Sequence, residues 1–546
     1  MQAWKMKVLQ TFGIALVATS IASPQFATAQ RRLTPIPHPI GTAQRAPSNN
    51  EARPANSPWT PLTNQPNFLV DGAANPILLM DGSVLVQDAG FPDWWKLTPD
   101  NTGSYVNGTW TQMASLTTLN NGYSPLYHST AVFPDGRMII EGGEYICVPA
   151  QNVCNPVWTN EGAIYDPIAN TWTNINPPAG WTTIGDAESV VLGNGKYMQA
   201  NCCTTQSAIL DPYNLTWTMT GFNKYDPNDE EGWTLLPNGL VLDVDAYVPI
   251  APFPYIPTGV NYELYNYRDG KWAVAGTTPV QLWDSWLSCG EMSQEPNAGP
   301  TFELGPGVLR PDGTVFYAGA DTCPNENGST AVYDTHNNSW TAGPNFPGTN
   351  DIADGPASLE VNGNVLMMAS PSFGAPPSTF FEWDGTSLNM VPGTPNAPTD
   401  GSYYGNMLVL PTGQILLTDF SDDVELYSSS SGPQKDWEPI VAAAPSKIQG
   451  GKSYQAYGFH FNGFSQGAAY GDDVQASTNF PIIRITNLNT GHVRYTRCHN
   501  PSTMAVASQD LNSVYFDVAP NTEHGASTLE VVANGIASAP FAVTVN

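Results

Sequence analysis

The stretch "YHSTAVFPDGRMIIEGG", from Tyr127 to Gly143, predicts a β-hairpin. Apolar residues fill two short runs on either side of Asp135-Gly136, and a glycine pair ends the second run. An Asp-Gly dipeptide between two apolar runs is the strongest short-range signal for a hairpin. The stretch also begins with Tyr-His, two side chains that can bind a metal or transfer a proton. It can therefore be one structural repeat among several, or the place where the chemistry happens.

The same pattern of apolar run, x-Gly turn and second apolar run occurs seven times in the chain. The turns are Asp81-Gly82, Asp135-Gly136, Asn194-Gly195, Asn238-Gly239, Asp312-Gly313, Asn362-Gly363 and Thr412-Gly413. Most hairpins are followed by two further strand-like runs, as in "AIYDPIANTWT", and the turn glycines lie 44 to 74 residues apart. Four-stranded units at this spacing are typical of kelch repeats. We therefore predict a seven-bladed kelch-type β-propeller over residues 59–444.

The pattern changes near Pro445, and residues 445–546 lack the cues of the repeat. Alternating strands over about 100 residues predict an immunoglobulin-like β-sandwich. Gly and Pro number 49 each among 546 residues, which suits many short strands joined by tight turns. The sequence thus predicts an all-β fold with a propeller followed by a sandwich.

The N-terminus resembles a secretory signal. Lys5 and Lys7 precede an apolar run, and small residues at Ala27 and Ala29 offer a cleavage site. The run is too short and too interrupted by polar residues to span a membrane, and no other stretch reaches that length. We expect a signal peptide over 1–29, a flexible linker over 30–58, and a secreted, extracellular or periplasmic protein without a membrane span.

The net charge of −29, from 48 acidic and 19 basic residues, argues against nucleic acid as a partner. A cationic ligand or metal would be tolerated, and the charge also keeps a monomer soluble outside the cell. We expect a monomer.

Seven cysteines are present, an odd number that leaves at least one unpaired within the chain. Cys147 and Cys154 are close enough in sequence to form a disulfide, and Cys202-Cys203 is a vicinal pair. The remaining cysteines are Cys289, Cys323 and Cys498. An oxidising compartment favours disulfides, but the sequence does not fix the pairing.

In a propeller the first strand of each blade lines the central channel, so the residues that begin these strands converge on one channel mouth. Counting eight residues back from each turn gives these positions, here called the entry ring. They are Ala73, Tyr127, Asp186, Glu230, Leu304, Asp354 and Tyr404, with Glu231, Glu303 and Tyr403 beside them. These carboxylates and tyrosines either cap strands and face water, or form a site for a cation, a sugar or a developing positive charge. Calcium is a candidate cofactor because it prefers oxygen ligands.

A secreted seven-bladed kelch propeller with a C-terminal β-sandwich resembles the galactose oxidase and glyoxal oxidase family over residues 60–546. "GFSQGAAYGDDVQASTNFPIIRITNLNTGHVRYTRCHN" carries the most specific likeness. In that family a loop of the last domain enters the channel and supplies a histidine ligand to copper, and the resemblance places His499 there. Cys498 would then approach Cys202-Cys203 at the same mouth, as a disulfide or a soft ligand.

The resemblance carries over only part of the family's copper site, which uses two tyrosines, two histidines and a cysteine joined to one tyrosine. Tyr127 matches the cross-linked tyrosine, Tyr403 the axial tyrosine and Tyr145 the aromatic that covers the cross-link. Tyr404 stands where a histidine is expected, and Ala73 where the cysteine is expected. The remaining Tyr127, Tyr403 and His499 are a thin ligand set for copper, which prefers several nitrogen ligands. Strand alternation points His128 away from Tyr127, as a structural residue.

Three functions follow. In the first, the channel mouth binds or processes an extracellular carbohydrate without an intact copper-radical centre. Asp186, Glu230 and Asp354 would then be acids or bases, and Tyr127, Tyr404 and His499 would be proton donors. In the second, the same rim is a non-catalytic platform for glycan or protein. In the third, copper with altered ligands oxidises a small alcohol or aldehyde.

Overall fold

The computed structural model describes residues 57–66, 68, 72–148, 153–246, 260–283, 303–320, 327–352, 354–371, 374–471 and 474–546. The predicted signal peptide, all but the end of the predicted linker, Cys289 and Cys323 lie outside these residues. Among the described residues, no helix combines the length and the hydropathy that a membrane crossing requires. The described fold is all-β, with three short 3-10 helices at η1 (Leu116–Leu119), η4 (Ser402–Tyr404) and η5 (Lys435–Trp437).

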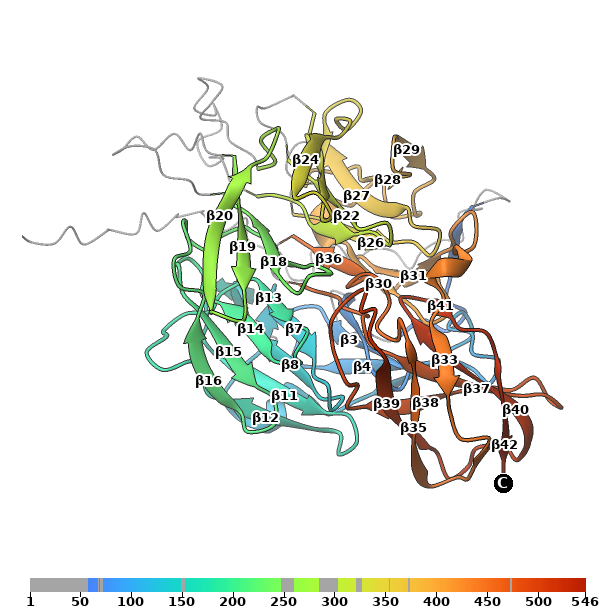
Figure 1. Cartoon of the computed structure of the whole chain (residues 1–546). Helices are drawn as coiled ribbons and strands as arrows, with labels where there is room; N and C mark the ends of the chain where they lie inside the picture. The colour runs from blue at the N-terminus through green and yellow to red at the C-terminus, as the bar shows by residue number, and fades with distance from the viewer. Residues whose placement is uncertain are drawn as a thin grey trace, which may run out of the picture. The chain divides into compact units, whose positions relative to one another are not determined.

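Each of the seven predicted hairpins forms two antiparallel strands, which confirms the repeat (Figure 1). The first four hairpins belong to four-stranded sheets. These sheets are β2 (Ala73–Leu78), β3 (Val84–Asp88), β4 (Trp94–Thr98) and β5 (Thr109–Gln112); β7 (Ser129–Val132), β8 (Met138–Glu141), β11 (Gly162–Asp166) and β12 (Thr171–Ile175); β13 (Ser189–Val191), β14 (Tyr197–Ala200), β15 (Ser207–Asp211) and β16 (Thr216–Thr220); and β17 (Thr234–Leu235), β18 (Val241–Val244), β19 (Asn261–Asn266) and β20 (Lys271–Thr277).

The last three hairpins continue the pattern, with two additions. Their sheets contain β21 (Gly307–Leu309), β22 (Thr314–Ala318), β23 (Thr330–Asp334) and β24 (Ser339–Ala342); β26 (Pro356–Leu359), β27 (Val365–Pro371), β28 (Thr379–Trp383) and β29 (Leu388–Val391), extended by β25 (Asn350–Asp351) and β36 (Ala468–Tyr470); and β30 (Asn406–Val409), β31 (Ile415–Thr418) and β32 (Glu425–Tyr427), completed by β1 (Trp59–Pro61). The first and last strands of the described repeat region therefore lie in one sheet, which protects its edge.

The turn glycines explain the uniform hairpins. In the second hairpin Gly136 N–H donates to the Phe133 carbonyl (2.9 Å), and Phe133 N–H donates to the Arg137 carbonyl (2.8 Å). The glycines of all seven turns have φ between 78° and 89°. This left-handed conformation costs glycine little because it has no Cβ atom.

The first strands of consecutive sheets contact one another, as expected when sheets surround a common axis. β2 contacts β30, β30 contacts β26, β26 contacts β21, β21 contacts β17, and β7 contacts β13. Tryptophans on the outer strands also join neighbouring sheets. The indole N–H of Trp172 on β12 donates to the Ala114 carbonyl (2.8 Å), and that of Trp217 on β16 donates to the Asn176 carbonyl (2.8 Å). These tryptophans are structural, which fits a β-propeller.

The C-terminal residues form one nine-stranded sheet. Its strands are β33 (Ile440–Ala443), β34 (Lys447–Ile448), β35 (Lys452–Phe459), β37 (Ile482–Asn487), β38 (Val493–His499), β39 (Asn512–Val518), β40 (Gly525–Ala533), β41 (Ile536–Ala537) and β42 (Phe541–Val545). Since β33 begins at Ile440, this sheet starts a few residues before the predicted boundary at 445. A separate three-stranded sheet contains β6 (Pro125–Leu126), β9 (Tyr145–Val148) and β10 (Val153–Pro156).

One segment of the C-terminal region lies among the propeller-like strands. β36 pairs with β26, with Tyr470 opposite Pro356, and it also contacts β30 and β21 (Figure 1). Val474 forms a bridge with Thr130 on β7, and the Gln466 side chain accepts a hydrogen bond from Leu235 N–H (2.7 Å). A C-terminal loop therefore reaches the first strands of several sheets.

Candidate functional site

The structure gathers most of the entry ring at one place. We call this group the entry cluster, and it is defined by charge, ring or hydrogen-bond interactions among its members. They are Tyr127, Glu144, Tyr145, Asp186, Glu230, Asp354, Tyr403, Tyr404, Phe420 and Tyr470. Asp186, Glu230 and Asp354 are each partly exposed as residues.

Tyr127 is the aromatic centre of this cluster. Its ring centroid lies 6.2 Å from the centroids of Tyr145, Phe420 and Tyr470, and the Tyr470 ring is stacked upon it. Tyr404 lies 4.3 Å from Tyr403 and 5.5 Å from Phe420, centroid to centroid. The aromatic side chains thus form a continuous wall.

Glu144 joins the carboxylates. Burial raises the pKa of Glu144 well above its usual value, and the charges of Asp186, Glu230 and Asp354 raise it further. A hydrogen bond with the Tyr145 hydroxyl opposes this rise. Burial likewise raises the pKa of Asp354 to about 7, while a hydrogen bond with Tyr470 lowers it. Asp354 can therefore hold a proton nearer neutral pH than an ordinary carboxyl group, which suits proton transfer.

Glycines bring neighbouring sheets close enough to form the cluster. Gly142 and Gly143 end the second hairpin, and Gly143 N–H donates to the Gly185 carbonyl (2.6 Å). A Cβ atom on Gly142 would overlap that carbonyl oxygen. The glycine pair at the end of "YHSTAVFPDGRMIIEGG" therefore places Glu144 beside Asp186.

Four members of the cluster have unusual backbone conformations. Tyr127, Glu230, Asp354 and Phe420 have φ between 49° and 62°. Bulky residues rarely adopt the left-handed region, and such residues concentrate at functional sites. Four of the ten cluster members therefore carry backbone strain.

The prediction that His499 joins this group is wrong. His499 ends β38 inside the C-terminal sheet, with Nε2 3.4 Å from Asp517 Oδ1 and its ring stacked on Tyr515. The next residue, Asn500, donates its N–H to the Pro134 carbonyl (2.6 Å), which lies at the turn end of β7 and β8. Tyr127 precedes the opposite end of β7, so the strand separates the two. Among the described residues, Tyr470 reaches the cluster from the C-terminal region, whereas His499 does not.

The predicted approach of Cys498 to Cys202-Cys203 is also wrong. Cys498 is a free thiol buried in the C-terminal sheet, whereas Cys202 and Cys203 are bonded to each other. The predicted Cys147–Cys154 disulfide is confirmed. The Cys498 N–H donates to the Met80 carbonyl (2.8 Å), again at the turn end of a hairpin. The Cys498 thiol therefore cannot form a disulfide at the end of the sheets where the entry cluster lies.

Cys498 is expected to resist modification in the folded protein. Burial raises the pKa of its thiol to about 12, so the reactive thiolate is scarce at neutral pH. Alkylation with iodoacetamide, followed by peptide mass spectrometry, should label Cys498 only after denaturation. A native Cys498–Cys202 or Cys498–Cys203 disulfide, or rapid native labelling, would contradict this structure.

The donor atoms of the entry cluster do not fit the copper set of the resemblance. They are phenol and carboxylate oxygens, whereas Cu(II) prefers several nitrogen ligands. His128 follows Tyr127 but is buried, with Nδ1 3.1 Å from Asn75 Nδ2 and its ring stacked on Trp94. Burial lowers the pKa of His128 to about 3, which agrees with the expected structural role. These oxygen donors suit a hard cation or a polyol better than copper.

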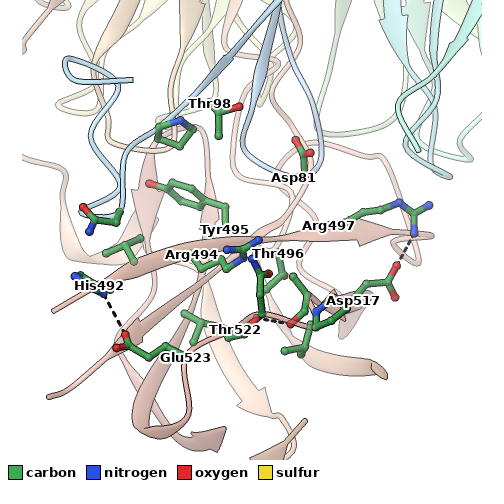
Figure 2. A pocket seen from close by; sticks show the side chains of 18 of the residues that line it. Asp81, Thr98, His492, Arg494, Tyr495, Thr496, Arg497, Asp517, Thr522 and Glu523 are labelled. Atoms are coloured by element: carbon green, nitrogen blue, oxygen red, sulfur yellow. Dashed lines mark hydrogen bonds and ion pairs between the residues drawn. The ribbon is translucent and has the colours of Figure 1, made fainter. Parts of the chain in front are cut away.

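A large cavity lies away from the entry cluster. About 810 Å³ in volume, it is lined by Asp81, the loop at Thr98 and the strand and loop segments around Arg494 and Asp517 (Figure 2). Arg497 and Asp517 form an ion pair across 2.6 Å, and His492 lies 3.2 Å from Glu523. These pairs leave the cavity wall close to neutral in charge, and none of its lining residues belongs to the entry cluster.

Two of the seven entry positions are apolar core. Ala73 is buried at the start of β2, and its carbonyl accepts a hydrogen bond from Phe420 N–H (3.0 Å). Leu304 is buried and bridges Trp283.

The sequence prediction of the entry ring did not include Glu144 or Phe420, although each follows the second strand of a hairpin and so lies at the entry end. Counting forward from the turns would have found them, but no sequence signal identified Tyr470.

Comparisons with known proteins give a partial likeness. No protein-family model matches the chain. The kelch-like protein terF of Aspergillus terreus is 27% identical over 135 residues, which are 24% of this chain. The chain thus spans about a quarter (26%) of the length of that relative. This match fits the resemblance to kelch proteins.

Two solved structures are similar to the fold at low identity. One is described as a novel fungal alcohol oxidase with catalytic diversity among the AA5 family, in complex with copper; it is 12% identical, with a TM-score of 0.46, over 90% of this chain and 99% of that chain. The other is the extracellular domain of a putative hybrid two-component system from B. thetaiotaomicron, 10% identical, with a TM-score of 0.40, over 87% of this chain and 57% of that chain.

Proposed function

We propose that the protein is secreted and that its entry cluster binds and processes an extracellular carbohydrate without copper. The observation that carries this proposal is the wall of tyrosines facing several carboxylates, among them Asp354 with a pKa of about 7. Aromatic faces stack on the C–H faces of sugars, and carboxylates accept hydrogen bonds from sugar hydroxyls. The two disulfides support an oxidising, extracellular compartment.

The proposed architecture supports this placement. We take the seven sheets as blades around one axis and the C-terminal sheet as a sandwich-like domain whose β36 segment enters the channel. The contacts between first strands and the pairing of β1 with β32 support the ring. The entry cluster would then lie at a channel mouth, with Tyr470 supplied from the second domain.

In the proposed chemistry Asp354 in its protonated form donates its proton to the leaving oxygen as the glycosidic C–O bond breaks, and a water molecule adds to the anomeric carbon. The carboxylates of Asp186 and Glu230 stabilise the positive charge that develops on the sugar ring, and one of them accepts the proton that the water loses. Tyr127 stays protonated, because burial and the charges of Asp354 and Glu144 raise its pKa well above the usual value. Its hydroxyl can therefore donate a hydrogen bond to the substrate but does not act as a base near neutral pH.

A panel of extracellular polysaccharides tests this function by measuring both binding and release of reducing sugar. The Tyr404→Ala variant, which removes one aromatic face, should weaken binding about tenfold, because one aromatic contact contributes about 1.5 kcal/mol. The control Tyr515→Ala changes an exposed tyrosine on β39 and should leave binding unchanged.

Binding without release by the wild-type protein would favour the non-catalytic platform instead. Copper near one equivalent in the purified protein, together with hydrogen peroxide formed from alcohols or aldehydes, would overturn the proposal in favour of an oxidase. Equal weakening by both tyrosine variants would show that the entry cluster is not the binding site.

A further inference from the structure

Lys224 lies at the centre of a second acidic group, distinct from the entry cluster. Its Nζ is 2.6 Å from Asp226, 2.9 Å from Glu231, 3.0 Å from Asp243 and 3.1 Å from Glu263, measured to the nearest carboxylate oxygens. The side chains of Lys224 and of these four partners are fully buried. We call this group, together with Glu188 and Asp245, the carboxylate core.

The carboxylate core has a charge imbalance. Six buried carboxyl groups surround a single ammonium, so full ionisation would leave five uncompensated negative charges. An isolated buried charge is very costly, and such groups are normally paired or bind a metal. The core must therefore hold either additional protons or a second cation.

Glu188 shows where a second cation would bind. It is fully buried, and neither of its carboxylate oxygens has a hydrogen-bond partner among the described residues. Ligand oxygens of Glu188, Glu231 and Asp243 all lie within 4.8 Å of one another. Ca²⁺–oxygen bonds are about 2.3–2.6 Å long, so oxygens around one ion are separated by up to about 5 Å.

We propose that Glu188, Glu231 and Asp243 bind one divalent cation of the calcium class. All available donors are carboxylate oxygens, which suit Ca²⁺ or Mn²⁺ and not Zn²⁺, whose sites favour nitrogen and sulfur. The Lys224 ammonium contacts Glu231 and Asp243 as well as Asp226 and Glu263, so the cation would share two of its three ligands with this ammonium. The cation would enter as the protein folds, since the site is fully buried.

The cation would connect two sheets beneath the entry cluster. Glu188 immediately precedes β13, whereas Glu231 precedes β17 and Asp243 lies on β18. Asp186 lies two residues before Glu188, and Glu230 is the neighbour of Glu231. The ion therefore has a structural role, and it fixes the backbone from which two entry residues project.

Binding should strengthen as pH rises, because carboxylate ligands must be deprotonated to hold a cation. The other charged groups that face the three ligands are Lys224, Asp226, Asp229, Asp245 and Glu263.

Metal analysis of the full-length protein, refolded from denaturant in Ca²⁺ and then dialysed against metal-free buffer, tests the site. We expect about one equivalent of Ca²⁺, and a melting temperature that falls by roughly 5 °C after denaturation and refolding in EDTA. Glu188→Gln should lose the metal. The control Glu360→Gln changes a buried carboxyl near Glu382 in another sheet and should retain it.

A second control separates this site from the entry cluster: Asp354→Asn should retain the cation. Absence of any divalent metal from the wild-type protein, with no melting shift after refolding in Ca²⁺, Mg²⁺ or Mn²⁺, would overturn the proposal. Metal retained by Glu188→Gln but lost in Asp354→Asn would overturn it as well. If Glu188→Gln does not fold, the stoichiometry of the wild-type protein and its melting shift at pH 8 against pH 5 decide the matter. None of these measurements depends on carbohydrate binding.

Discussion

Replacing Lys224 with methionine is expected to lower the free energy of unfolding by about 3–5 kcal/mol, because removing one partner of a buried ion pair leaves charge uncompensated. Four carboxylates lie within 3.1 Å of its ammonium, and Nζ also lies 5.6 Å from the centre of the Trp272 ring. Methionine keeps the apolar stem but supplies no charge or N–H donor. Urea unfolding in EDTA, so that bound metal does not mask the effect, measures the loss.

Lys196→Met is the matched control. The Lys196 side chain is 46% exposed and its ammonium lies 3.8 Å from Asp211, and exposed ion pairs contribute little. We expect its loss to change the free energy of unfolding by less than about 0.5 kcal/mol. Comparable losses in both variants would show that the carboxylate core is not stabilised by its central ammonium.

The cost of Lys224→Met should increase with pH. Burial raises the pKa of Asp245, as it does for Glu188, Glu231, Asp243 and Glu263, and the ammonium of Lys224 opposes this rise. A carboxyl whose pKa is higher in the folded than in the unfolded state binds more protons when folded, so its contribution to stability is lost as pH rises through the folded pKa. Removing Lys224 raises these pKa values further. Unfolding at pH 5 should therefore show a smaller difference between variant and wild type than unfolding at pH 8.

The hairpins and most of the entry ring could be predicted from the sequence because both follow local rules. An x-Gly turn fixes the register of its two strands, and a constant count of eight residues then leads to the entry end of each sheet. Tyr127, Asp186, Glu230, Asp354 and Tyr404 accordingly lie together. Two positions found by the count, Ala73 and Leu304, are buried apolar residues.

Long-range contacts could not be predicted in the same way. Tyr470 reaches the cluster through the pairing of β36 with β26, between strands more than 100 residues apart, and nothing in the local pattern specifies that pairing. His499 was placed by resemblance alone, and β38 carries it to the turn end of the hairpins instead. Lys224 and its partners looked like ordinary charged residues, because burial depends on how neighbouring sheets pack.

Asp354→Asn is expected to lower the rate of sugar release by roughly 10²–10⁴-fold on the substrate found in the polysaccharide panel. Asparagine keeps the shape of the side chain but cannot donate the proton of a carboxylic acid. In the wild-type protein the rate should fall as pH rises above about 7, because Asp354 loses its proton there. The variant should lack this fall in rate at alkaline pH, here called the alkaline limb of the pH–rate profile, while still binding the polysaccharide. A variant with unchanged rate and pH profile would show that Asp354 is not the acid.

Tyr470→Phe tests the same assignment through a different measurement. The Tyr470 hydroxyl lies 3.0 Å from the Tyr403 carbonyl and also hydrogen-bonds Asp354, so its single proton is shared between them. Its bond to the carboxylate favours the ionised form, and the phenylalanine variant should therefore raise the pKa of Asp354. The alkaline limb of the rate should move to higher pH, while the rate at acidic pH stays close to that of the wild type because Asp354 remains protonated. A merely structural role for Tyr470 would lower the rate at every pH and leave the position of the limb unchanged.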